Sequence, residues 1–186
     1  MHSNELYHHG VKGMKWGVRR AQKKQAKLDY KAAKKSARDA YDQSLTKSYK
    51  TVGQSREEYD RGRISRADFE KTNSAATRSD VNAHYKKNVA YAKAKRDYNI
   101  ARGKNADKAN ARYERAKKDS KYTAKMEWDN YVDQVARDHP SVARKLAESG
   151  HISYDDLDRA TDKVKKETDE LIKQLEYERD YYKDQI

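Results

Sequence analysis

The chain has 186 residues, of which 35% are hydrophobic and 39% charged, and its formal net charge is +13. Ordinary globular domains hold roughly 45–50% apolar and about 25% charged residues, so we expect narrow buried stripes rather than a large core. The absence of Cys excludes disulfides, thiolate metal sites and a cysteine nucleophile. No apolar run approaches the roughly 20 residues of a membrane helix, and length alone favours one domain.

The composition predicts helices. Ala, Lys, Arg, Glu and Asp are abundant, whereas the chain has one Pro and seven Gly, and no segment shows the alternation of a strand. We expect an all-α fold: an elongated helical bundle or set of helical hairpins, with an extended N-terminal arm and a coiled-coil-like C-terminal helix. The predicted segments are an arm over residues 1–19, a basic helical body over 20–150 and an acidic helix over 151–186. Net charges are +9 for residues 1–63, +8 for 64–150 and −4 for 151–186.

The N-terminal arm is the most distinctive stretch. It contains three clustered glycines, which disfavour a helix, and Met14 and Trp16, which can serve as anchors buried in a partner. The predicted docking residues are His9, Gly10, Gly13, Met14, Lys15, Trp16, Gly17, Arg19 and Arg20. Trp16 can equally pack on the chain's own helices as a latch, and both interpretations stay open. Adjacent His8 and His9 point apart in an extended segment, so we predict no metal site.

Five helices are predicted for the basic body. The first runs from about Arg20 to Val52, ends at Gly53, and has a stripe at Tyr30, Ala33, Ala37, Tyr41, Leu45, Tyr49 and Val52. A short helix then opens with a capping box at Ser55 and ends near Gly62. Ser65 caps a helix from Arg66 to about Arg102, and the next runs from Asn105 to Arg137. Pro140 occupies the first position of a short additional helix that ends near Ser149.

The C-terminal helix runs from Tyr154, after a Ser153 cap, to about Asp184. Its apolar residues recur at intervals typical of a coiled coil, which predicts self-association through this helix. The predicted self-association residues are Leu157, Val164, Leu171, Leu175 and Tyr182.

Basic residues in adjacent pairs suggest contact with nucleic acid. The candidates are Lys23, Lys24, Lys34, Lys35, Lys86, Lys87, Lys95, Arg96, Lys117 and Lys118. They can bind phosphate backbones, and no base-reading motif accompanies them, so such binding would be non-specific and sensitive to salt. Lys-rich stripes are also simply solvated helix faces, and the tyrosines follow the packing stripe more closely than a base-stacking pattern.

No catalytic constellation is evident. His84, His139 and His151 stand apart from any nucleophile or paired carboxylate, and Asp155 and Asp156 suit the first turn of a helix. We therefore predict a protein that is not an enzyme and that uses neither cofactor nor metal.

Residues His8 to Arg20 resemble a segment found in proteins of tailed phages and prophages of Gram-positive bacteria. That segment reads His-His-Gly-aliphatic-x-Gly-x-Lys-Trp-Gly-aliphatic-Arg-Arg, and it occurs near an end of otherwise dissimilar proteins, often structural or head-associated. The resemblance covers thirteen residues here and implies phage origin and association with the virion or its assembly.

Together these features predict a phage interaction protein that acts in the host bacterial cytoplasm, in the virion, or in both. Its arm would dock on a phage structural protein or a host protein, and its basic helices would contact DNA or an acidic protein surface. Three alternatives remain: an assembly scaffold that self-associates, a phage-encoded inhibitor of a host nucleic-acid enzyme, and a non-specific DNA-binding protein. The apolar faces are mostly Ala and Tyr, so we expect no membrane contact.

Overall fold

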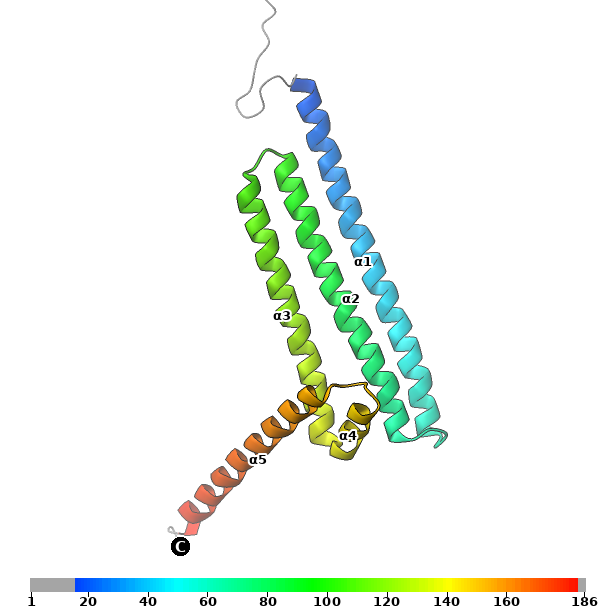
Figure 1. Ribbon diagram of the computed structural model, residues 1–186, viewed down its shortest axis with the longest axis vertical. Helices are drawn as coiled ribbons and strands as arrows, with labels where there is room; N and C mark the ends of the chain where they lie inside the picture. Colours follow the sequence, from blue (N-terminus) through cyan, green and yellow to red (C-terminus); the bar gives the residue numbers. More distant parts are fainter. Residues whose placement is uncertain (1–15, 184–186) are drawn as a thin grey trace, which may run out of the picture. The chain divides into compact units, whose positions relative to one another are not determined.

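The computed structural model describes the backbone of residues 16–183 and the side chains of residues 17–179 and 181. This part of the chain contains five α-helices and no strand (Figure 1). The helices are α1 (Trp16–Asp60), α2 (Arg66–Ala101), α3 (Ala106–Asp138), α4 (Pro140–Glu148) and α5 (Tyr154–Lys183). The predicted all-α fold class is confirmed.

Three of the predicted helix starts have a side-chain cap in the structure. Ser65 Oγ accepts a hydrogen bond from the Asp68 backbone N–H at 3.2 Å, and Ser153 Oγ accepts one from the Asp156 N–H at 3.0 Å. Asn105 Oδ1 does the same for Lys108 at 2.8 Å. Each side-chain oxygen satisfies a backbone donor that has no partner within its own helix. Pro140 begins α4, where its missing N–H costs nothing.

Three helices end at a glycine with positive φ. The φ angles of Gly62, Gly103 and Gly150 are 68°, 80° and 73°, a region that a Cβ atom makes costly. After α1 the N–H of Gly62 donates to Tyr59 and that of Arg63 donates to Glu58, which satisfies two carbonyls of the last turn. The same pattern follows α2 and α4.

Helix α1 is longer at both ends than predicted. It begins at Trp16, so residues 16–19 are helical rather than part of an extended arm. It also continues through Gly53 to Asp60, so the predicted end at Gly53 and new start at Ser55 are wrong. Ser55 is buried inside the helix, and Tyr59 stacks on Phe69 of α2 with ring centroids 5.6 Å apart. This packing offsets the roughly 1 kcal/mol that a glycine costs inside a helix.

The buried stripe of α1 differs from the predicted one at two places. Ala33 and Tyr49 are exposed, while Lys34 is half-buried and Ser48 is buried in their stead. None of the helices within residues 16–183 combines the length and the apolarity that crossing a membrane requires.

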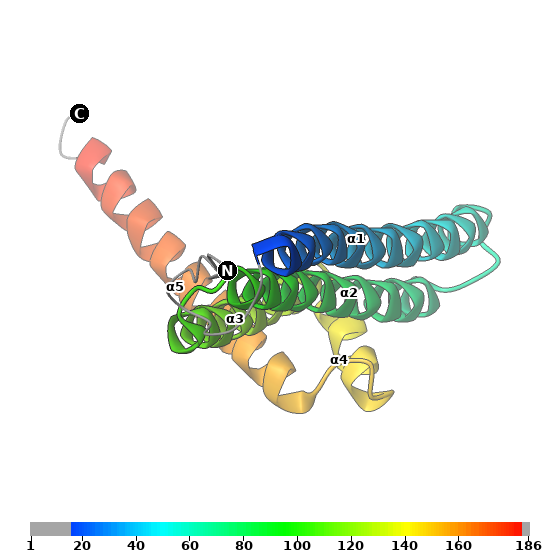
Figure 2. The ribbon, with the colours of Figure 1, turned by 90° about the horizontal axis from the view of Figure 1, so that it is seen from above.

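The contacts divide the chain into two compact units. Among described residues, unit 1 comprises residues 16–46 and 80–124, and unit 2 comprises residues 47–79 and 125–183. Helices α1, α2 and α3 contribute to both units. Within unit 1, α2 lies between α1 and α3, as the two views of Figures 1 and 2 agree.

The apolar core belongs to unit 2. It is formed where the end of α3 meets α4 and the start of α5, and Val132, Leu146 and Ala160 have no exposed surface. The remaining core residues are Val135, Ala136, Ala143, Ala147 and Ile152. Around this core, buried Asp133 receives hydrogen bonds from Arg159 at 2.8 Å and from Lys163 at 2.6 Å, which join α3 to α5.

Candidate nucleic-acid interface

Positive charge is concentrated in unit 1. Its described residues include 22 Lys and Arg against eight Asp and Glu, a net charge of +14. Those of unit 2 include 19 Lys and Arg against 20 Asp and Glu, a net charge of −1. Helices α1, α2 and α3 each contribute basic residues to unit 1.

All ten basic residues predicted to contact nucleic acid lie in unit 1. Six of them are exposed on the outer faces of the helices: Lys23, Lys24, Lys35, Lys86, Lys117 and Lys118. Lys87 is half-buried, with its Nζ 3.7 Å from the centroid of the Tyr41 ring. The remaining three, Lys34, Lys95 and Arg96, line a common groove.

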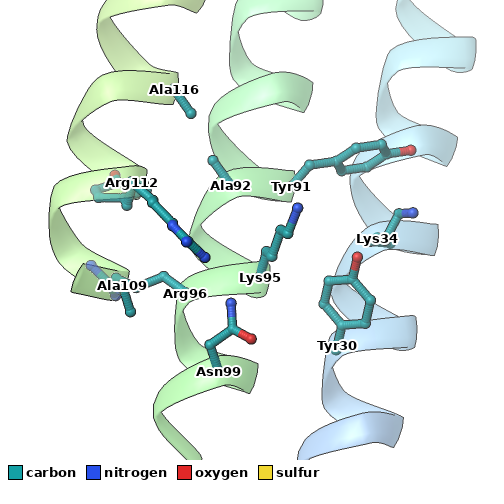
Figure 3. Close-up of a pocket in the computed structure, with 11 residues that line it drawn as sticks. Tyr30, Lys34, Tyr91, Ala92, Lys95, Arg96, Asn99, Ala109, Arg112 and Ala116 are labelled. Atoms are coloured by element: carbon teal, nitrogen blue, oxygen red, sulfur yellow. The ribbon is translucent and has the colours of Figure 1, made fainter. Parts of the chain in front are cut away.

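This groove lies over α2, with α1 on one side and α3 on the other (Figure 3). Its volume is about 500 Å³. The lining residues are Tyr30 and Lys34 of α1, Tyr91, Ala92, Lys95, Arg96 and Asn99 of α2, and Ala109, Arg112, Tyr113 and Ala116 of α3. In Figure 3, Arg112 reaches from α3 toward α2, while Lys95 and Asn99 rise from α2 between the flanking helices. We call this the α2 groove.

Aromatic rings hold two of the cations in the α2 groove. The Nζ of Lys34 lies 5.1 Å from the centroid of the Tyr91 ring, and the guanidinium of Arg96 lies 4.8 Å from that of Tyr113. Arg96 also pairs with Asp97 at 2.7 Å. A cation over an aromatic face is attracted by the ring quadrupole, so these contacts favour one position of each long side chain.

Sequence reasoning missed Arg112 and Asn99 because it searched for adjacent basic pairs. Neighbouring residues point in different directions on a helix, whereas residues four apart share a face. Tyr91, Lys95 and Asn99 have that spacing on α2, as do Tyr30 and Lys34 on α1. A search at this spacing would have found most of the groove.

The predicted docking residues are only partly described. His9, Gly10, Gly13, Met14 and Lys15 lie outside the described residues. Trp16, Gly17, Arg19 and Arg20 form the first turns of α1, and Arg19 is half-buried while Gly17 and Arg20 are exposed. The choice between docking arm and latch therefore stays open.

The predicted self-association residues separate into two groups. Leu157 is partly buried against the core of unit 2, and Val164 is half-buried. Leu171 and Leu175 are each 55% exposed, together with Ile172 at 48%. The side chain of Tyr182 lies outside those described. An apolar surface toward the end of α5 thus has no partner within the described chain.

The histidines lie in separate surroundings. His84 packs beside Tyr41 with ring centroids 5.8 Å apart, and His151 Nδ1 lies 3.3 Å from Ser74 Oγ. Within the described residues, no three His, Asp or Glu side chains come together in a group that could hold a metal ion.

Comparison with known proteins gives one match. Residues 2–23 match a family of unknown function, DUF7211. No curated protein and no solved structure matches the chain. The family match covers the N-terminal segment and the first turns of α1, and it includes neither the α2 groove nor unit 2. It marks the N-terminal segment as one that recurs in other proteins and assigns it no activity.

Proposed function

We propose that this chain is a non-enzymatic protein that contacts nucleic acid through the phosphate backbone, using the basic surface of unit 1. The observation that supports the proposal is the net charge of +14 in unit 1 beside −1 in unit 2. A surface that serves solubility alone mixes both signs, as unit 2 does. A large surface of one sign attracts polyanions and speeds their association.

The pairing of charges supports the same proposal. Most of the ion pairs among the described residues lie in unit 2, including Arg137 with Glu167 at 2.6 Å and Arg159 with Asp133 at 2.8 Å. In unit 1, Lys and Arg outnumber Asp and Glu by 22 to eight among the described residues. Phosphates of a nucleic acid would supply the missing anions and release bound counterions.

We place this activity in a tailed phage or prophage, in the virion or during its assembly. The support for this setting is the resemblance of residues 8–20 to the phage segment. In this proposal the N-terminal residues dock on a phage structural protein or a host protein, and unit 1 faces the genome.

The test is nucleic-acid binding by two variants that carry the same total charge. The unit 1 variant replaces Lys24, Lys35, Lys117 and Lys118 with glutamine, and the unit 2 variant replaces Lys50, Lys145, Lys165 and Lys173. All eight lysines are exposed, so neither variant should change the fold. Fluorescence anisotropy with a labelled 30-nucleotide DNA, from 50 to 300 mM salt, gives the affinity and its salt dependence.

We expect the affinity of the unmodified protein to fall steeply with salt, by about 10³-fold between 50 and 200 mM for six phosphate contacts. The unit 1 variant should bind more weakly with a shallower salt slope, while the unit 2 variant should bind almost as the unmodified protein does. Equal losses in both variants, or affinity for polyglutamate in place of DNA, would contradict the proposal. The second result would instead support an acidic protein surface as the partner.

The setting is tested separately, by quantitative mass spectrometry of purified mature particles. The unmodified chain is expected in the particles, and a variant with Gly13→Ala and Trp16→Ala is expected to be lost from them. Absence of both proteins would exclude a role in the mature virion while leaving nucleic-acid binding intact.

A second candidate function, assembly scaffold, is favoured by the exposed apolar residues of α5. Leu171, Ile172 and Leu175 are each about half exposed in the described chain. The exposed part of these side chains does not stabilise a monomer. A second copy of α5 would cover them as in a coiled coil. Light scattering should then show a dimer or larger oligomer that becomes a monomer on Leu171→Ser with Leu175→Ser. A concentration-independent monomer would exclude this candidate.

A further inference from the structure

The lining of the α2 groove contains cations but no carboxylate. Lys34, Lys95, Arg96 and Arg112 contribute positive charge, and Asn99 and the tyrosine hydroxyls contribute neutral donors. Of the carboxylates next in sequence to lining residues, Asp29 and Asp97 line a neighbouring pocket of about 240 Å³ that shares Tyr30 with the groove, and Glu114 lines neither pocket. The α2 groove therefore has the chemistry of a site for an anion.

Two of these cations lack a partner within the described chain. Arg96 is tied to Asp97 and Tyr113, and Lys34 lies over Tyr91. Among the described residues, however, neither Lys95 nor Arg112 forms an ion pair, a hydrogen bond or a ring contact. Like charges gathered in a recess repel one another, and a bound anion would relieve that repulsion.

The flanking helices give the surface around these cations the shape of a groove. Lys95 projects from α2, which lies between α1 and α3 (Figure 3). A duplex is a stiff, wide cylinder that meets the outer lysines of such a surface. A single strand is narrow and flexible, and proteins that bind it commonly use grooves that combine cations with aromatic side chains.

We propose that the α2 groove binds the backbone of a single-stranded nucleic acid, with a phosphodiester between Lys95 and Arg112. This inference rests on the proposed function and adds a preference for single strands. Lys34 and Asn99 lie within the same groove as further donors, and Tyr30 and Tyr91 form its wall on the α1 side. The exposed lysines outside the groove bind duplex and single strand alike, because both present phosphates to an open surface.

The experiment compares two double variants that each remove two positive charges. The groove variant is Lys95→Gln with Arg112→Gln, and the matched surface variant is Lys117→Gln with Lys118→Gln. All four side chains are exposed, and circular dichroism should confirm that both variants keep the helix content of the unmodified protein. The probes are a labelled 20-nucleotide oligothymidine and a labelled 20-base-pair duplex at one salt concentration.

The groove variant should lose affinity for oligothymidine about tenfold more than the surface variant, because two charge-assisted hydrogen bonds are removed. Duplex affinity should fall equally in the two variants. A third variant, Arg112→Lys, keeps the charge and should retain most of the binding to oligothymidine.

Equal losses of oligothymidine binding in the groove and surface variants would overturn the inference, and so would loss of duplex binding confined to the groove variant. Displacement of oligothymidine by polyglutamate at equal charge concentration would also overturn it, in favour of an acidic peptide. These outcomes differ from failure of the proposed function, in which the unmodified protein would bind neither DNA probe.

Discussion

Units 1 and 2 both contain parts of α1, α2 and α3, yet they differ in how many residues they bury and in their net charge. Among the described residues, Ala94 and Ala109 are the buried apolar residues of unit 1, whereas unit 2 contains the whole core cluster around Val132 and Leu146. The buried polar residues, such as Glu70 and Asp133, also lie in unit 2. Unit 2 therefore supplies most of the burial that stabilises the fold, and unit 1 supplies the charged surface proposed to bind a partner.

This comparison explains how a chain with so few apolar residues can form defined structure. A helix with mostly Ala and Tyr on its packing face buries little area, and burial contributes roughly 25 cal/mol per Å². Unit 1 gains additional order from contacts such as the stacked pair Tyr30 and Tyr98, with ring centroids 5.3 Å apart. Its cations are thus displayed on helices that are stabilised modestly.

The largest expected difference is between two leucine substitutions. Leu146 of unit 2 has no exposed surface, so Leu146→Ala should lower the free energy of unfolding by about 2–5 kcal/mol through lost burial and a cavity. Leu28 of unit 1 is 51% exposed, and Leu28→Ala should change that free energy by less than about 0.5 kcal/mol. Urea unfolding followed by circular dichroism measures both. Similar losses in the two variants would show that burial is shared between the units.

A smaller difference is expected between two aspartates. Asp133 of unit 2 is buried and bound by Arg159 and Lys163, so Asp133→Asn should cost about 1–2 kcal/mol. The cost stays below that of a fully buried pair because both cations are partly exposed and regain water. Asp42 of unit 1 pairs with Arg38 at 3.5 Å on an exposed surface, and Asp42→Asn should cost less than about 0.5 kcal/mol. Urea unfolding measures both variants. If Asp133→Asn leaves the free energy of unfolding unchanged, the ion pairs between α3 and α5 do not stabilise the fold.

Acid should weaken unit 2 over a defined range of pH. Burial alone would raise the pKa of Asp133, but hydrogen bonds from Lys163 and Arg159 outweigh it and hold that pKa below its ordinary value of 3.8. The pKa of Asp156 is lowered likewise, since hydrogen bonds from Ser153 and Trp128 outweigh its burial. The unfolded chain then binds more protons than the folded one, so stability is present above about pH 4 and is lost as pH falls through the folded pKa values.

The acid effect can be measured by urea unfolding between pH 5 and pH 2.5. Protonation of Asp133 removes the same charge as Asp133→Asn, so the loss attributable to this residue should be of similar size. In the Asp133→Asn variant the decline below pH 4 should be shallower than in the unmodified protein. Identical pH profiles for the two proteins would exclude Asp133 as a source of the decline.

The sequence predicted elements whose signals are local. The caps at Ser65 and Ser153 act within one turn, and both start helices as predicted. Residues 16–19 and the segment around Gly53 were mispredicted because neighbouring helical turns override a single glycine. The α2 groove was found only in part, since it requires the register of three helices that are far apart in sequence. The division into two units arises from contacts between distant segments, which no local pattern encodes.

The smallest predicted differences concern glycines. They test whether the cost of replacing a glycine of positive φ is the same in both units. Gly53 lies inside α1 with no atom within 4 Å of an added Cβ, so Gly53→Ala should stabilise the protein by about 0.5–1 kcal/mol. Gly103 of unit 1 and Gly150 of unit 2 have φ angles of 80° and 73°, where Ala is strained, so either change to Ala should cost about 1 kcal/mol. Urea unfolding of the three variants should give similar costs for Gly103 and Gly150 despite their different cores, because this strain depends on φ alone. A stabilising Gly53→Ala would support the continuity of α1, and a destabilising one would place a break in the helix at that residue.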